Sequence, residues 1–366
     1  MQTDDYTVIG LHCEFLLTNL RSVEVAAFRT NAETIALRTF HRRNCSISHQ
    51  RSAPPRTRFF NTCFIVSCCR NATIAIALGQ LASSGPARGP PLTMPRVLST
   101  HLFMNQRLHP GHLEIASRAG AQAVEIFGAR QHFDYTSRDH VSELAAWLRS
   151  NPLEVWSIHA PIHADREMGI ASAPAVNVLH PDKARRIDAM DEIKRALETA
   201  EYIPIHNLVV HLGGQEDGWS PRTIEYALTA LEHLGAFARP LGVRLLVENL
   251  TSEPTTPEHL VSILEVGHLD NVGICLDLGH AHLTVGIPAA IATLGSRIAT
   301  VHVHDNHGTK DEHLWPGDGT IDWMAAVKAL KALTVPPATV LEIDCILDVP
   351  PTEISARIEK AFERFA

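Results

Sequence analysis

Residues 272–283 run Val272-Gly-Ile-Cys-Leu-Asp277-Leu-Gly-His280-Ala-His282-Leu283, and this stretch decides the fold. An apolar run of strand length ends in a carboxylate, and an imidazole follows three residues later. A short, continuous apolar run is typical of a strand that is buried on both faces, as in a parallel sheet. The stretch therefore predicts a buried parallel strand with Asp277 at its carboxyl end.

The same pattern recurs along residues 97–343 as an apolar run, a polar loop and a stretch with helical periodicity. The clearest helical stretch is 182–202, where Ile187, Met190, Ile193 and Leu197 are spaced by three and four; residues 221–237 and 321–333 are similar. Eight strands alternating with helices over about 270 residues predict an α/β protein with a (β/α)₈ TIM barrel. The alternative is an open doubly wound sheet, but no Gly-rich nucleotide turn follows the first strand. The predicted strands are 97–100, 123–127, 155–159, 208–211, 244–248, 272–277, 298–304 and 339–343.

Ionisable side chains follow six of these strands directly, at the end of the barrel where active sites gather. Converging carboxylates repel one another and are costly to bury unless a cation compensates. Mixed nitrogen and oxygen ligands suit Zn²⁺, Mn²⁺, Fe²⁺ or Co²⁺, and the absence of a cysteine motif argues against a thiolate site. We therefore predict a divalent-metal site, and strand geometry leaves open which of His302 and His304 is the ligand. The strand-end residues are His159, His211, Glu248, Asp277, His302 with His304, and Glu342.

A second group of ionisable residues follows the seventh predicted strand. Residues 302–313 contain four histidines, and Asp311-Glu-His313 closes this group. The glycine turn Pro316-Gly-Asp-Gly319 then leads into a helix. Its plain role is to let the chain reverse beside the pocket, and phosphate binding through its backbone N–H groups is the weaker alternative.

Residues 1–93 differ from the rest of the chain. Residues 1–94 carry 10 Arg, no Lys and 5 acidic residues, and they hold five of the seven cysteines. Apolar stretches there, such as 23–28 and 73–78, are isolated, so we predict an N-terminal extension that is disordered or belongs to a start assigned too far upstream. The alternative is an Arg-rich targeting segment. Met94 directly precedes the first predicted strand, and we assign residues 94–366 to the barrel.

Composition narrows the classes of function. The chain is 45% hydrophobic with a net charge of −8, so it has material for a large core and no general attraction to nucleic acid. No uncharged apolar run reaches the roughly 18 residues of a membrane span. Seven irregularly spaced cysteines make a poor disulfide framework, so we expect a cytoplasmic protein. The sequence is compatible with a homo-oligomer.

From Met94 onward, the order of these motifs resembles the xylose-isomerase-like TIM barrel superfamily. This superfamily includes the sugar phosphate isomerase/epimerase group and the endonuclease IV DNA-repair enzymes. The resemblance implies one to three divalent ions (Mn²⁺, Zn²⁺, Co²⁺ or Mg²⁺). The single-metal epimerase branch implies the ligands Glu248, Asp277, His302 and Glu342. A site for more than one metal adds His159, His211, His280, Asp311 and His313.

The residues that make up these motifs favour the sugar branch of this family. Ile162 stands where the nuclease branch has a tyrosine after His-Ala-Pro, and residues 95–366 carry 22 basic against 35 acidic residues. One feature departs from the sugar branch and favours the nuclease branch. The chain has the Asp-x-His pair Asp311 and His313, which single-metal epimerases usually lack. We expect a small-molecule sugar or sugar phosphate as the partner, with nucleic acid disfavoured.

For an isomerase or epimerase, the resemblance implies a metal-polarised carbonyl and an enediolate, with Glu248 and Glu342 moving protons off and onto the substrate carbon. His280 would orient a substrate hydroxyl. Rival hypotheses are an endonuclease IV-like phosphodiesterase acting on abasic DNA and a non-catalytic barrel that binds sugar or metal. The predicted substrate-binding residues are His159, His211, His304 and His307.

Overall fold

The computed structural model describes residues 94–164, 174–344 and 350–365, together with four short strands nearer the N-terminus. The chain divides into two units, Met1–Arg88 and Gly89–Ala366. In the first unit, β1 (Val25–Arg29) pairs antiparallel with β2 (Ile35–Thr39), and β3 (Phe64–Ser67) pairs antiparallel with β4 (Thr73–Ile76). The rest of the extension predicted over residues 1–93 lies outside the described residues, so its nature stays a prediction.

Eight parallel strands of the second unit form a closed barrel. They are β5 (Arg96–Ser99), β6 (Ala123–Phe127), β7 (Glu154–His159), β8 (Ile205–Val210), β9 (Arg244–Glu248), β10 (Gly273–Asp277), β11 (Ile298–Val303) and β12 (Ala338–Leu341). Each strand pairs with the next along the chain, and β12 pairs with β5 to close the ring. The predicted TIM barrel is confirmed and the open sheet is wrong. The predicted bounds match β6 and β9, and the other six strands differ at one or both ends.

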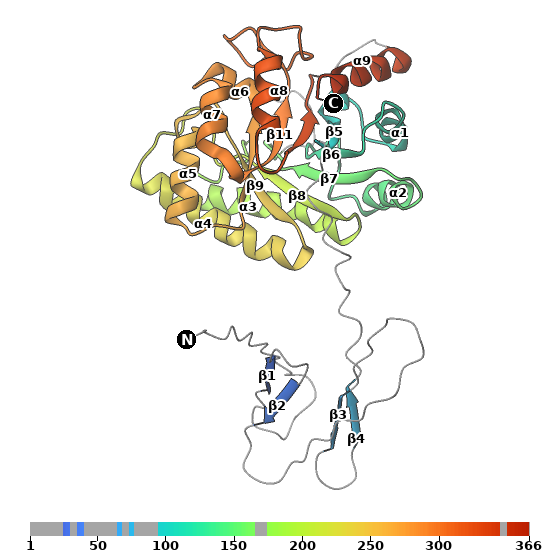
Figure 1. The fold of residues 1–366 in the computed structure, drawn as a ribbon, viewed down its shortest axis with the longest axis vertical. Helices are drawn as coiled ribbons and strands as arrows, with labels where there is room; N and C mark the ends of the chain where they lie inside the picture. Colours follow the sequence, from blue (N-terminus) through green and yellow to red (C-terminus); the bar gives the residue numbers. More distant parts are fainter. Residues whose placement is uncertain are drawn as a thin grey trace. The chain divides into compact units, whose positions relative to one another are not determined.

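Helices surround the strands of this unit (Figure 1). Several begin at a residue whose side chain accepts a hydrogen bond from a free backbone N–H of the first turn, such as Asp182 before α3 and Ser220 before α4. No helix in the described part of the chain has the length and apolar character needed to cross a membrane. The helices are α1 (Pro110–Arg118), α2 (Arg138–Arg149), α3 (Lys183–Leu197), α4 (Pro221–Ala238), α5 (Pro257–Val266), α6 (Leu278–Leu283), α7 (Ile287–Leu294), α8 (Trp323–Lys331) and α9 (Pro351–Glu363).

The buried face of α3 differs from the predicted one at Ile187, in its second turn. Ile193 and Leu197 are each 1% exposed, as expected, but Ile187 is 43% exposed. At about 100° per residue, Ile187 lies roughly 120° around the helix from Ile193. Ala189 and Glu192 are buried in its place. Spacing by three and four therefore predicted the helix correctly but overestimated the width of its buried apolar face.

The interior of the barrel changes from apolar to ionisable along several strands. Successive side chains point alternately outward to the helices and inward to the barrel axis. Leu246 and Cys275 belong to an inward apolar cluster, and two residues later come Glu248 and Asp277. Val340 and Glu342 repeat this order on the last strand. The carboxyl ends of the strands therefore bring the ionisable groups together above an apolar floor.

Candidate metal centre

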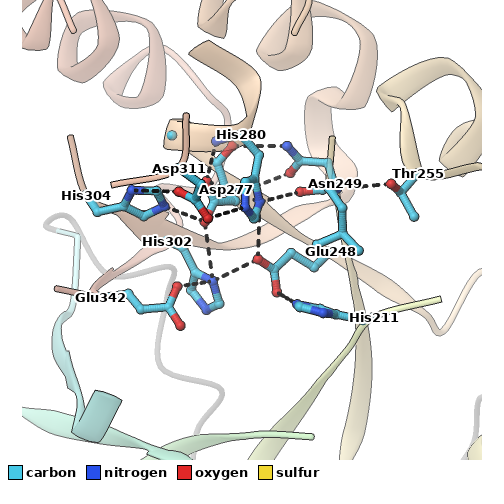
Figure 2. Close-up of polar contacts among 12 residues, drawn as sticks. His211, Glu248, Asn249, Thr255, Asp277, His280, His302, His304, Asp311 and Glu342 are labelled. Atoms are coloured by element: carbon cyan, nitrogen blue, oxygen red, sulfur yellow. Dashed lines mark hydrogen bonds and ion pairs between the residues drawn. The ribbon is translucent and has the colours of Figure 1, made fainter. Parts of the chain in front are cut away.

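Four side chains from neighbouring strands converge inside the barrel mouth (Figure 2). Glu248, Asp277, His302 and Glu342 each offer a ligand atom, and these atoms all lie within 4.8 Å of one another. All four residues are at most 3% exposed. Asp277 and His302 are direct register partners of β10 and β11, which explains why they meet.

His302, rather than His304, belongs to this group of four. Its Nδ1 lies 3.2 Å from Glu248 Oε1, 3.0 Å from Glu342 Oε2 and 3.8 Å from Asp277 Oδ2. Burial by itself would lower the pKa of His302, but the surrounding carboxylates of Glu342, Glu125 and Glu248 hold that pKa well above its ordinary value. Three buried carboxylates facing one imidazole have the charge and the mixed oxygen and nitrogen donors that suit a borderline divalent cation.

Two further histidines approach Glu248 from the other side. Its Oε2 lies 3.3 Å from His159 Nε2 and 3.1 Å from His211 Nε2. The Nδ1–H of His159 donates to the carbonyl of Ala160 over 2.8 Å, which leaves Nε2 turned toward the carboxylate. His159, His211 and Glu248 thus form a second group of atoms within ligand distance of one another.

Asp311 connects the remaining histidines. One of its oxygens, Oδ2, lies 3.1 Å from both His280 Nε2 and His313 Nε2. His304 stacks on His313 with a centroid distance of 3.9 Å, and its Nε2 is 3.0 Å from Asp277 Oδ2. Burial opposes protonation, yet Asp277 and Asp311 raise the pKa of His280 to about 10, and Asp311 and Glu342 raise the pKa of His313 to about 9. Asp311 is therefore flanked by two imidazoles, His280 and His313, whose pKa values lie above the ordinary value.

The structure brings all nine predicted ligand positions and His304 into one network, but it does not bring His307 into it. The His307 side chain is 54% exposed, and its Nδ1 lies 2.8 Å from Glu312 Oε2 in the same loop. Sequence position alone grouped His307 with the other histidines of that segment.

Sequence reasoning missed three residues that border the cluster. Glu125, in the middle of β6, is 0% exposed and lies 3.2 Å from His302 Nε2. Cys275 has its sulfur within 4.8 Å of ligand atoms of Glu248 and His302, although no motif cysteine was expected near the site. Burial raises the pKa of Cys275, so it remains a neutral thiol. The available signals were a charge inside the apolar run 123–127 and the inward position two residues before Asp277.

Asn249 is the third missed residue, and it fastens the ends of β9 and β10. Its side chain accepts a hydrogen bond from the N–H of Asp277 over 2.7 Å and donates to the Asp277 carbonyl over 3.0 Å. The Asn249 carbonyl also accepts from His280 Nδ1 over 3.0 Å. The Asn249 side chain thus holds Asp277 in place, and its backbone carbonyl holds His280, next to Glu248.

The glycine turn after His313 binds an internal carboxylate rather than offering its N–H groups to a phosphate. Asp305 Oδ2 accepts from the N–H of Gly317 over 2.8 Å and from Trp323 Nε1 over 2.7 Å, and its Oδ1 accepts from the N–H of Ile321 over 3.1 Å. A Cβ on Gly319 would lie 2.3 Å from Asp305 Oδ1, so only glycine allows this approach. The phosphate alternative is wrong for the Gly317 N–H, and the turn reverses the chain as predicted.

Comparison with known proteins places this barrel in a family. A family model described as "Xylose isomerase-like TIM barrel" matches residues 113–361. The chain therefore belongs to the xylose isomerase-like TIM barrel family.

Individual relatives fall on both branches of that family. An inosose isomerase of Bacillus velezensis is 22% identical over 232 residues, which is 60% of this chain and 78% of that protein. A "Probable endonuclease 4" of Acholeplasma laidlawii is 24% identical over 238 residues, 57% of this chain and 80% of that protein. The crystal structure of a D-tagatose 3-epimerase-like protein aligns with a TM-score of 0.57 and 25% identity, over 75% of this chain and 100% of that one.

The share of each relative that is matched varies. An uncharacterized protein of Methanocaldococcus jannaschii is 32% identical over 152 residues, which is 38% of this chain and 52% of that protein. Over a relative from Sinorhizobium fredii, the match spans 63% of that protein. The chain thus spans roughly half to two thirds of the length of these two relatives.

Proposed function

We propose that this chain is a divalent-metal-dependent isomerase or epimerase that acts on a sugar or sugar phosphate. The observation that carries the proposal is that two carboxylates from different strands meet at one nitrogen of one imidazole. Glu248 ends β9 and Glu342 follows β12, with two strands between them, yet both lie within 3.2 Å of His302 Nδ1. Two carboxylates that reach one point from different directions can remove a proton from one position of a substrate and return it at another.

In this proposal Glu248, Asp277, His302 and Glu342 hold the metal, and Glu248 and Glu342 also move the proton. One carboxylate takes the proton from the carbon next to the substrate carbonyl. The other delivers a proton to the opposite face of that carbon in an epimerase, or the proton returns to the neighbouring carbon in an isomerase. When bound, the divalent ion would polarise the carbonyl and stabilise the negative charge that develops on its oxygen.

The histidines around this centre take binding roles. His280 has a raised pKa, so we assign it as a hydrogen-bond donor, and not a base, that orients a substrate hydroxyl in place of its contact with Asp311. His159 and His211 face Glu248, and we assign them to the substrate or to a second ion.

A second candidate function is an endonuclease IV-like phosphodiesterase. The observation in its favour is that Asp311 and His313 belong to the same network as the other predicted ligands. A further group of atoms within ligand distance, from His304, His313 and Glu342, also adjoins the first. This arrangement offers ligands for more than one ion, which a hydrolase would use to activate water against a phosphodiester.

The test combines metal analysis with two activity assays on one preparation. The protein is loaded with Mn²⁺ or Co²⁺ and incubated in deuterated water with a panel of ketoses, their phosphates and inosose. We expect exchange of a carbon-bound proton, detected by mass spectrometry, and no nicking of duplex DNA with an abasic site. Glu342→Gln should abolish the exchange, because one of the two proton carriers is then neutral.

The other outcomes distinguish the rivals. Cleavage of abasic DNA with about three ions per chain and no exchange on any sugar would establish the phosphodiesterase. Metal binding with neither activity would instead indicate a barrel that binds metal or sugar without turnover.

A further inference from the structure

His302 is held between carboxylates on both of its ring nitrogens. Nδ1 faces Glu248, Asp277 and Glu342, as described above. Nε2 points the other way and lies 3.2 Å and 3.3 Å from the two oxygens of Glu125. Glu125 is on β6, three positions around the barrel from β11, so this contact crosses the barrel interior. The ring therefore has one edge in the metal-binding group and the other edge on a residue outside it.

Glu125 is anchored in a way that keeps its carboxylate aimed at His302. The hydroxyl of Ser157 donates to Glu125 Oε2 over 2.7 Å, and the two residues are register partners on β6 and β7. Both residues are 0% exposed. Within the described part of the chain, His302 Nε2 is the one basic group within ion-pair distance of Glu125. A buried carboxylate is costly unless a specific partner compensates it, so this pairing needs a reason beyond packing.

We propose that Glu125 is a positioning residue that accepts the Nε2–H of His302 and so presents the Nδ1 lone pair to the metal. The proposal rests on the metal centre of the proposed function. A metal-binding imidazole is neutral and so carries a single N–H, and an ionised carboxylate can only accept it. With that proton on Nε2, Nδ1 is free to bind a cation, and the ring cannot turn without losing the hydrogen bond. Carboxylates that hold metal-binding histidines in this way increase metal affinity.

A plainer role would make Glu125 a counter-charge that only stabilises the fold. The two roles differ in what Glu125→Gln changes. Loss of a counter-charge lowers the melting temperature of the protein, with or without metal. Loss of a positioning residue also weakens the metal complex and alters the hydrogen bond of one identified ring.

The experiment measures Zn²⁺ affinity of the full chain by competition with a chromogenic chelator. We expect Glu125→Gln to weaken Zn²⁺ binding by about 10- to 100-fold. Ser157→Ala keeps the carboxylate but removes its anchor, and we expect a smaller loss. The matched control is Glu192→Gln, because Glu192 is also a buried glutamate, 3% exposed, but pairs with Arg130 and Tyr135. This control should lower the melting temperature and leave the Zn²⁺ affinity unchanged.

Nitrogen-15 NMR of histidine-labelled, Zn²⁺-loaded protein provides the second measurement. The His302 signals are identified by their loss in His302→Gln. In the native chain we expect a hydrogen-bonded Nε2–H and a metal-shifted Nδ1, and we expect Glu125→Gln to lose the hydrogen-bonded signal.

Three results would overturn the proposal. The first is an affinity of Glu125→Gln within about twofold of the native value. The second is an equal loss of affinity in Glu125→Gln and Glu192→Gln. The third is a native His302 without a proton on Nε2, which decides the matter even if the variant does not fold. Zn²⁺ binding without proton exchange on any sugar would contradict the proposed function alone, because no measurement here depends on turnover.

Discussion

Glu248 makes more contacts to ring nitrogens than any other carboxylate in the described cluster. Oε2 lies beside His159 and His211, while Oε1 lies 3.2 Å from His302 Nδ1 and 3.7 Å from His280 Nδ1. Burial would raise the pKa of Glu248, but His302 and His211 hold that pKa well below its usual range. The carboxylate is therefore ionised at neutral pH, as its proposed roles of metal ligand and proton acceptor require.

Replacing Glu248 by Gln separates chemistry from structure. The change keeps the size of the side chain and removes its charge, so we expect the barrel to fold. Proton exchange on the substrate should fall by at least about 10²- to 10⁴-fold, and metal retention should weaken as well. Metal content, melting temperature and exchange rate are measured on one preparation.

The control for this prediction is Glu265→Gln. Glu265 is exposed on α5, and its replacement should change the free energy of unfolding by no more than about 0.5 kcal/mol, with no effect on exchange. Normal exchange and normal metal content in Glu248→Gln would remove Glu248 from the mechanism, and with it most of the case for this site.

At the scale of secondary-structure elements, buried imidazoles join the loop before α1 to the loop before α2. His132 Nδ1 donates to the carbonyl of Gln106 over 2.6 Å, and the N–H of Leu108 donates to the His132 carbonyl over 2.8 Å. His140 Nε2 donates to the carbonyl of Leu108 over 2.7 Å. Burial lowers the pKa of His132 to about 4. Burial and the neighbouring His109 also lower the pKa of His112 to about 4. These rings are neutral in the folded protein down to acidic pH.

This arrangement predicts a loss of stability between pH 6.5 and pH 4. As the pH falls through that window, His132 of the unfolded chain gains a proton while His132 of the folded chain does not. The unfolded state then binds more protons, so the free energy of unfolding decreases, by up to about 1.4 kcal/mol per pH unit and about 3 kcal/mol in all for His132. Below pH 4 both states are protonated and this contribution is constant.

Urea unfolding of metal-free protein at several pH values checks the prediction. His132→Asn keeps a donor near Gln106 but cannot titrate, so its unfolding free energy should fall less steeply below pH 6.5 than that of the native chain. His233→Asn, an exposed change on α4, should leave the native slope unaltered. Identical slopes for His132→Asn and the native chain would show that His132 titrates normally in the fold.

At the scale of the whole molecule, the barrel strands and every residue of the metal centre lie in the unit Gly89–Ala366. We therefore predict that a chain beginning at Met94 folds and binds metal like the full chain. Circular dichroism, the melting temperature and metal content of the two proteins provide the comparison. A truncated protein that is insoluble or free of metal, beside a full chain that is neither, would show that the upstream region supports the barrel.

Much of the fold could be predicted because each barrel strand is a short apolar run closed by a polar loop. Such a run is a local property, and it identified all eight strands with small errors at their ends. The helix α3 was also predicted from a local pattern, but the exposure of Ile187 was not. The spacing of apolar residues shows which face of a helix is buried, whereas the packing of its neighbours decides how wide that face is. The strand-end ionisable residues were located for the same local reason.

The sequence by itself determined the barrel, the strand ends that meet at its mouth and the residue types gathered there. These depend on period-2 alternation and on the rule that parallel strands present their carboxyl ends together. The family resemblance implied that His302 belongs to the group of four, and the tertiary structure places it there; only the tertiary structure decided that Glu125 reaches His302 from across the barrel and that His307 lies apart. The physical reason is that these contacts join strands far apart in the chain, where distance depends on ring closure, register and strand twist rather than on any local pattern.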